Sequence, residues 1–352
     1  MNPYLTEKIL RCEEYKPAED IYPIKLDANE SPYLPSPAMQ KAITEAVSAV
    51  KVDRYPDPAA AELVKAFASH IGVNAAHVVA GNGSDELISV ICSSFLDRGD
   101  NMLVTAPDFS MYGFYADIIG ANIITYQKQD GYDIDFDELI SIINEKQVKL
   151  VFLSNPCNPT GIAYPADVIE DFVSRAPCLV VIDEAYMEFC TKNASLLSRY
   201  QNHENLIILK TLSKAVGLAA LRVGFAIAVD EISGAIRKMK SPYNVNSFSQ
   251  AAAKACLSFA DEIAANTMRM CANTKRMHGF FSSHADEWGY SMRECNTNFV
   301  LLKFADAEKP RRIFDALKAQ GIIIRCMGNR LRISAGTDEE TDLFLSAIQK
   351  LM

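Results

Sequence analysis

The sequence lacks the features that mark several common classes of protein. Its five histidines have no metal-ligand spacing and its nine cysteines include no C-x-x-C pair, so no metal site and no disulfide framework is expected. Acidic residues (44) outnumber lysine and arginine (35), and the net charge is −9. This balance argues against a nucleic-acid-binding protein but allows a local basic pocket for an anionic substrate.

Long hydrophobic runs are also missing. The longest, near Leu218–Val229, is short and is interrupted by Arg222, so no segment is expected to span or bind a membrane. The first ten residues, MNPYLTEKIL, show neither the basic end nor the apolar run of a signal peptide. Together with the scattered cysteines, this predicts a cytoplasmic protein with reduced thiols.

Short apolar runs alternate with helical periodicity over most of the chain. Runs such as LVFLS and LVVID are continuously apolar, as strands buried on both faces require. The alternation predicts an α/β fold whose large domain has a mostly parallel seven-stranded sheet covered by helices. The expected strands are His77–Ala80, Met102–Thr105, Asn122–Tyr126, Lys149–Ser154, Cys178–Asp183, Leu206–Lys210 and Val223–Val229, and the expected helices are Asp85–Phe95, Met111–Ile119, Asp135–Glu145, Pro165–Ser174 and Asp230–Met239.

The pattern changes after Ser247. A helical region without proline runs to about Glu287, and strands mixed with helices follow it, which predicts a smaller α+β domain. The start of the chain is rich in proline and has no strong period, so we expect it to pack on another part. We predict an N-terminal segment over 1–45, a large domain over 46–285 and a small domain over 286–352, with both chain ends forming the small domain.

Gly81–Asp85 (GNGSD) follows an expected strand and opens a helix. Glycines allow a tight turn there, and the unpaired N–H groups at a helix N-terminus attract a phosphate. The alternative is a plain turn in which Ser84 or Asp85 caps the helix. The run is not G-x-G-x-x-G, so a dinucleotide site is not indicated.

Asn155–Gly161 (NPCNPTG) directly follows the strand LVFLS. Two Asn-Pro pairs make a stiff turn, and ligands bind at the carboxyl ends of parallel strands. This turn can present the amide of Asn158 to a ligand oxygen. A connection without any role in binding is the alternative.

Asp183 ends the buried strand LVVID, and Tyr186 lies three residues further on. An unpaired buried carboxylate is costly, so Asp183 is expected to have a cationic partner, for which a protonated pyridine nitrogen is suitable. A helix cap or a structural ion pair is the alternative.

Lys214 follows the strand LIILK and lies among hydroxyls and small residues, with Arg222 eight positions later. Desolvation and nearby positive charge lower the pKa of an amine and make it nucleophilic toward an aldehyde. An ordinary surface lysine is the alternative.

These four motifs, in this order, resemble the fold-type-I pyridoxal-phosphate (PLP) aminotransferases over nearly the whole chain. The resemblance implies that Lys214 binds PLP covalently and carries protons, that Asp183 pairs with the pyridine nitrogen, and that Asn158 and Tyr186 bond the ring oxygen. It further implies a homodimer. Its remaining implied cofactor contacts are Ser84, Asp85, Thr211, Ser213 and Arg222 at the phosphate, Phe109 on the ring, and Tyr55 acting on the neighbouring subunit's phosphate.

Within that superfamily, the stretches LDANESPY, RYPDP, GNGSDE and SPYNVNS are similar to histidinol-phosphate aminotransferases. This implies transamination between histidinol phosphate and 2-oxoglutarate in histidine biosynthesis. The implied substrate-binding residues are Arg332, Arg325, Tyr15 and Asn29. The turn within Cys326–Leu331 is shorter than in typical members, and Glu14 stands where proline is common.

Other readings are an aromatic or different amino-acid aminotransferase, a threonine-phosphate decarboxylase and a non-enzymatic PLP-binding regulator. A regulator would need a DNA-binding module, for which there is no room before Asn29. We assign Arg330 to ordinary strand-surface charge.

Overall fold

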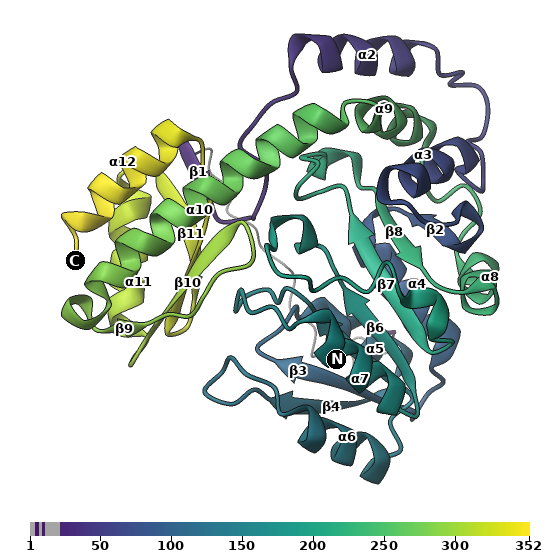
Figure 1. Ribbon diagram of the computed structural model, residues 1–352, viewed down its shortest axis with the longest axis horizontal. Coiled ribbons are helices and arrows are strands. Elements are labelled where there is room, and N and C mark those ends of the chain that lie inside the picture. The colour runs from purple at the N-terminus through teal and green to yellow at the C-terminus, as the bar shows by residue number, and fades with distance from the viewer. Residues whose placement is uncertain (1–3, 7–8, 11–21) are drawn as a thin grey trace.

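The computed structural model describes residues 4–6, 9–10 and 22–352 and contains two sheets (Figure 1). The larger has the order β2-β8-β7-β6-β5-β3-β4. Strand β8 is antiparallel to both of its neighbours, and the pairs from β7 to β4 are parallel. The predicted seven-stranded, mostly parallel sheet is therefore confirmed. Its strands are β2 (Val78–Gly81), β3 (Asn101–Ala106), β4 (Asn122–Gln127), β5 (Leu150–Ser154), β6 (Leu179–Asp183), β7 (Leu206–Thr211) and β8 (Gly224–Ile227).

Helices cover this sheet on both faces, which explains why its central strands are apolar throughout. In β5, Leu150 and Phe152 belong to one core cluster, and Val151 and Leu153 belong to the other. Alternate side chains of a strand point to opposite faces, so every position of β5 is buried. On one face lie α4 (Gly83–Phe95), α5 (Met111–Ile119) and α8 (Asp230–Met239), and on the other lie α3 (Ala61–Ile71), α6 (Phe136–Glu145), α7 (Ala166–Arg175) and α9 (Ser247–Leu257).

The second sheet is smaller and has the order β1-β11-β12-β10-β9. Its edge strand β1 pairs in parallel with β11, so strands from opposite ends of the sequence lie side by side, as the purple strand among yellow ones shows (Figure 1). The strands are β1 (Ile24–Leu26), β9 (Tyr290–Ser291), β10 (Phe299–Phe304), β11 (Ile322–Met327) and β12 (Arg330–Ser334), packed with α11 (Glu308–Ala319) and α12 (Asp338–Gln349).

The predicted helical region after Ser247 consists of two helices, α9 and α10 (Ala260–Trp288). Figure 1 shows α10 running from the large sheet to the small one. Its Ile263 packs in the core of the large sheet, whereas Met277 and Phe281 pack in the core of the small sheet. The division at 45 and 285 stays a prediction, because α10 contributes to both cores.

The start of the chain supplies one further helix, α2 (Pro37–Ser48), which packs on α9. Ser36 caps it, since its hydroxyl accepts a hydrogen bond from the N–H of Met39. Within the described ranges, no helix is both long and apolar enough to cross a membrane.

Candidate active site

The residues predicted to carry chemistry follow three neighbouring strands at the same edge of the large sheet. Asn158 follows β5, Asp183 ends β6 and Lys214 follows β7. The β5–β6 register pairs Ser154 with Asp183, so these parallel strands end level with each other. The carboxyl ends of such strands are where α/β proteins bind ligands.

Asp183 is buried, being 5% exposed. Its carboxylate accepts hydrogen bonds from the hydroxyl of Tyr112 (2.8 Å) and from the N–H of Ala185 (3.0 Å). Burial raises the pKa of Asp183 to about 6, against the effect of these two hydrogen bonds. Asp108 and Asp85 raise the pKa of Asp183 further because they are negatively charged. Among the described residues no lysine, arginine or histidine forms an ion pair with Asp183, so the carboxylate suits a cationic group on a ligand.

Tyr112 was not predicted as a site residue. It lies on α5, is fully buried, and its ring stacks on Phe152 with 4.9 Å between centroids. Phe109 meets the edge of Tyr112 at 5.5 Å. The three-residue spacing of Phe109 and Tyr112, which puts both on one side of a helical turn, is the signal that could have identified it.

Lys214 is partly buried, and its ammonium donates a hydrogen bond to the backbone oxygen of Ala28 at 3.0 Å. It lies 5.9 Å from the ring centre of Tyr186. The Ala28 oxygen is a neutral partner, so a covalent ligand can replace this contact without leaving a buried carboxylate unpaired.

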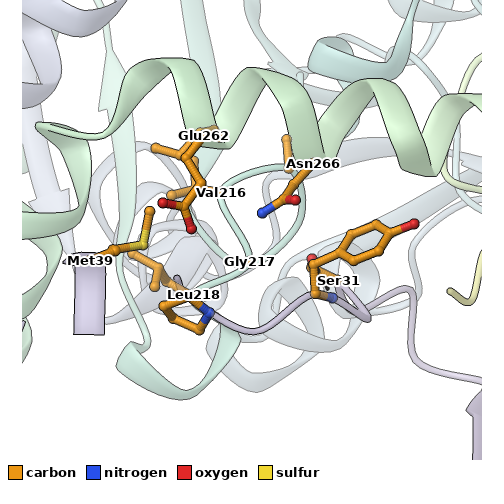
Figure 2. A pocket seen from close by; sticks show the side chains of 11 residues that line it. Ser31, Met39, Val216, Gly217, Leu218, Glu262 and Asn266 are labelled. Carbon is orange, nitrogen blue, oxygen red and sulfur yellow. Dashed lines mark hydrogen bonds between the residues drawn. The ribbon is translucent and has the colours of Figure 1, made fainter. Parts of the chain in front are cut away.

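The segment after Lys214 packs against residues from the start of the chain, and Figure 2 shows Gly217 and Ser31 around one pocket. Gly217 has a φ of 79°, and a Cβ there would lie 3.1 Å from the Cβ of Ser31. Ser36 donates two hydrogen bonds to Glu262 of α10, at 2.7 Å and 2.6 Å. The start of the chain therefore packs against the lysine-bearing loop and is itself anchored to α10.

Ser84, Asp85 and Arg222 come together where α4 begins. The Arg222 guanidinium contacts Asp85 at 3.1 Å and donates a hydrogen bond to the hydroxyl of Ser213 at 3.4 Å. A Cβ on Gly224 would lie 2.5 Å from the backbone nitrogen of Ser84, so only glycine fits there. The predicted group is therefore assembled, and its helix N-terminus and guanidinium can hold a phosphate.

Thr211 lies at the same strand end as this group. Its hydroxyl accepts a hydrogen bond from the N–H of Ser213 at 3.1 Å. This bond shapes the turn that leads into Lys214.

Tyr186 and Asn29 are directly linked. The amide of Asn29 donates a hydrogen bond to the hydroxyl of Tyr186 at 2.9 Å and accepts one from the hydroxyl of Ser334 at 2.8 Å. Asn29 is 1% exposed and thus ties the site to the small sheet. Its predicted contact with substrate stays a prediction.

Arg332 and Arg325 are direct cross-strand neighbours in β11 and β12. Arg332 donates hydrogen bonds to the Asn158 side-chain oxygen (2.6 Å) and to the Asp27 backbone oxygen (2.7 Å). Both acceptors are neutral. Arg332 therefore brings a positive charge to Asn158, which suits an anionic substrate group.

The sequence profile described as aminotransferase class I and II matches residues 22–348. The chain belongs to this family. It is 35% identical over 337 residues to a histidinol-phosphate aminotransferase of Clostridium kluyveri (strain ATCC 8527), with 94% of this chain and 93% of the relative covered. It is also 35% identical to one of Thermoanaerobacter sp. (strain X514), with 98% of each covered.

Among solved structures, histidinol-phosphate aminotransferase from Sinorhizobium meliloti in complex with pyridoxal-5'-phosphate superposes with a TM-score of 0.90. The two sequences are 27% identical, and the match covers 99% of this chain and 97% of that one. The fold predicted for the aminotransferase is thus confirmed by an independent structure.

The aminotransferase also has a buried ionic cluster that the sequence did not reveal. The Lys128 ammonium lies 3.3 Å from the Asp108 carboxylate and 3.0 Å from the Cys157 sulfur. Asp108 also accepts hydrogen bonds from Thr105 (2.8 Å) and Ser154. Burial opposes the charge on Lys128, but Asp108 and Cys157 keep its pKa above the ordinary value. The cluster joins the turn carrying Phe109 to the turn carrying Asn158.

Two predicted site residues stand apart from the rest. Tyr55 is 82% exposed and stacks on Tyr243 with 4.7 Å between ring centres. Tyr15 lies outside the described residues.

Proposed function

We propose that this aminotransferase uses PLP to transfer an amino group between L-histidinol phosphate and 2-oxoglutarate, giving imidazole-acetol phosphate and L-glutamate, in histidine biosynthesis. The full-length relatives at 35% identity support this substrate pair. The structural observation that carries it is the pairing of Arg325 with Arg332 beside Asn158.

The described residues fit PLP. Its phosphate would lie at Arg222 and the start of α4, where Gly224 lets β8 approach the backbone of Ser84 closely. Its pyridine nitrogen would pair with Asp183, which is buried without a cation of its own. Asn158 and Tyr186 would bond the ring oxygen, and Phe109 would stack on the ring.

When bound, PLP supplies an electron sink for the charge that develops on the substrate Cα. Asp183 favours a protonated ring nitrogen by charge. Lys214 Nζ, as a free amine, would accept the proton that the substrate Cα loses and would donate a proton later in the amino-group transfer. The buried walls around Asp183 and Tyr186 keep water from these groups.

Both substrates present an anion near the reacting carbon, which is a phosphate in histidinol phosphate and a carboxylate in glutamate. A guanidinium fork binds either one. One arginine pair can therefore accept both substrates in turn.

The substrate assignment is tested by half-reactions of the PLP form, followed by its absorbance. Histidinol phosphate and glutamate should convert it, and phenylalanine and threonine phosphate should not. Equal reaction with phenylalanine or unphosphorylated histidinol would make a broader aromatic aminotransferase the better description. Borohydride reduction should attach the cofactor to Lys214, and an adduct on another lysine would contradict the cofactor assignment.

We also propose a homodimer in which Tyr55 reaches the cofactor phosphate of the second copy, and that the enzyme works in the cytoplasm. The exposed Tyr55–Tyr243 stack supports contact with another chain, because such large rings are usually covered. The eight cysteines within the described ranges are free, which agrees with a reducing compartment.

A further inference from the structure

A second group of positive side chains lies further along the same face of the small sheet. Lys303 of β10 is the direct partner of Arg330 on β12. This pair lies two pairs along from Leu301 and Arg332, so both pairs point to the same side of the sheet. Like charges directly opposite in a sheet destabilise it unless something offsets them. Lys303 donates a hydrogen bond to the backbone oxygen of Asp130 at 2.6 Å, so this face meets the loop after β4.

Arg330 itself is unusual. Its Nε is buried without a hydrogen-bond partner, and its side chain makes no hydrogen bond or ion pair with any residue in the described ranges. The backbone at Gly131 packs against the Arg330 guanidinium, since a Cβ at Gly131 would lie 2.8 Å from Arg330 Nη2. A desolvated guanidinium without an acceptor is costly, so this arrangement favours an anionic ligand.

Tyr132 closes the group from the side of the large sheet. Its side chain is 3% exposed, and its buried hydroxyl forms no hydrogen bond of normal geometry with any residue that the structure describes. Burial raises the pKa of Tyr132, with Ser291 and Arg330 acting in the opposite direction. Ser291 is the partner of Lys303 on β9, so its hydroxyl belongs to the same face.

The neighbouring charges leave an excess of positive charge. Arg293 and Lys303 each lie 5.6 Å from the centre of the Tyr132 ring. The carboxylate of Asp133 lies 3.6 Å from Arg293, and both side chains are about half exposed. Such a pair is screened by water, and no carboxylate in the described part of the chain forms an ion pair with Lys303 or Arg330.

We propose that Lys303, Arg330, Tyr132 and Ser291 form a second anion site, for a phosphate group, separate from the Arg325–Arg332 pair. A phosphate has enough acceptor oxygens to meet a guanidinium, an ammonium and two hydroxyls at once. Arg330 and Arg332 are two positions apart on one strand, which sets the sites roughly 7 Å apart at the Cα atoms. The site does not depend on which amino acid the enzyme transaminates.

The test is the thermal unfolding of the PLP-loaded enzyme titrated with inorganic phosphate. Wild type should unfold at a higher temperature as phosphate is added, by roughly 2–4 °C near saturation. Arg330→Gln should unfold at a higher temperature than wild type in phosphate-free buffer, because the repulsion with Lys303 is gone, and should lose most of the phosphate response. Lys303→Gln should show the same two effects, and it replaces Arg330→Gln in the test if that variant does not fold.

Two variants separate this site from others. Arg311→Gln changes an exposed arginine on α11 that forms an ion pair with Asp315, and should keep the wild-type response. Arg332→Gln should keep the part of the response that Arg330→Gln loses, because it removes only the phosphate bound at the Arg325–Arg332 pair. The proposal is overturned if wild type does not respond, if Arg330→Gln responds as wild type does, or if Arg332→Gln abolishes the response. If wild type does not turn over histidinol phosphate, the proposed function is contradicted instead, whatever the phosphate response.

The phosphate could be a free ion or the ester of a second substrate molecule. Inhibition of turnover by high histidinol phosphate that disappears in Lys303→Gln would identify the ester. Phosphate stabilisation without such inhibition would identify the free ion.

Discussion

At the scale of single residues, Asp183 is held where the protein alone does not favour its charge. Burial raises its pKa from an ordinary 3.8 to about 6, so between these values the folded state holds a proton that the unfolded chain has lost. The stability contributed by this group is full below the unfolded pKa and is lost as the pH rises through about 6. The difference corresponds to about 3 kcal/mol.

We therefore expect the cofactor-free Asp183→Asn variant to gain stability over wild type as the pH rises from 4 to 7, by up to about 3 kcal/mol. Urea unfolding of both proteins across this range measures the gain. Asp286→Asn, at an exposed position of α10, should show no such trend. If the difference in unfolding free energy between wild type and Asp183→Asn is the same at every pH, burial does not raise the pKa of Asp183.

With PLP bound, the same substitution should be harmful, because it lowers turnover. Asp183→Asn should keep the cofactor, because the shape is unchanged, but lose most of its turnover, because an amide does not stabilise a pyridinium. Cofactor absorbance and steady-state rates check the two parts. Near-normal turnover would refute the role of Asp183.

Tyr112 is the residue that tunes this carboxylate. Its hydrogen bond lowers the pKa of Asp183, so Tyr112→Phe should raise that pKa and move the acid limb of the pH–rate profile to higher pH. We expect kcat/KM to fall roughly 10-fold, the effect of losing one charge-assisted hydrogen bond. Tyr115→Phe, on the same helix but without a bond to Asp183, should leave the profile unchanged. A loss of rate with no shift of the limb would point to a packing effect.

At the scale of elements, the β11–β12 hairpin carries Arg325 and Arg332, the two arginines that we propose to bind substrate. Only Gly328 and Asn329 separate its strands. Because this turn is short, Arg325 and Arg332 are directly opposite each other. Two hydrogen bonds fix its tip: the N–H of Phe304 donates to the backbone oxygen of Asn329 (2.9 Å), and the side-chain amide of Asn329 donates to the backbone oxygen of Phe304 (2.8 Å).

We expect Arg332→Gln to lower kcat/KM for both histidinol phosphate and glutamate by roughly 10- to 100-fold, because it removes a charge-assisted bond to each. Arg325→Gln should affect the two less evenly, since Arg325 lies on the preceding strand. Steady-state kinetics with each substrate measures this. Equal losses in both variants would show that the two arginines act as one unit.

The elements show how far a single sequence leads. All seven large-sheet strands were predicted within about two residues, because strands apolar on both faces and bounded by turns give a strong local signal. β1 and β9 were missed, being three and two residues long and held by distant partners. The break at Ser258–Phe259 was missed because no proline or glycine marks it.

The site divides in the same way. Lys214, Asp183 and Asn158 could be predicted because each directly follows a strong strand signal. Tyr112, the Asp108–Lys128 pair and the environment of Arg330 could not, because they depend on contacts between segments far apart in sequence. Arg330, assigned to surface charge from its sequence, is partly buried and has its Nε enclosed.

At the scale of the whole molecule, the position of Tyr55 predicts shared sites. Mixing a Lys214→Ala chain with a Tyr55→Ala chain should restore one working site in each mixed dimer if Tyr55 acts across the interface. About a quarter of wild-type activity is then expected after full exchange. No recovery, with exchange demonstrated and a severe defect in Tyr55→Ala alone, would place Tyr55 in its own subunit's site.

The pairing of β1 with β11 also has a consequence for how the protein is made. Ile24–Leu26 leaves the ribosome almost 300 residues before its partner Ile322–Met327. At roughly 5–20 residues per second, the first strand waits on the order of 15–60 s for its neighbour. During this time its apolar residues have no sheet to join. A chaperone that binds short apolar segments near a nascent N-terminus would therefore have its longest opportunity at this strand.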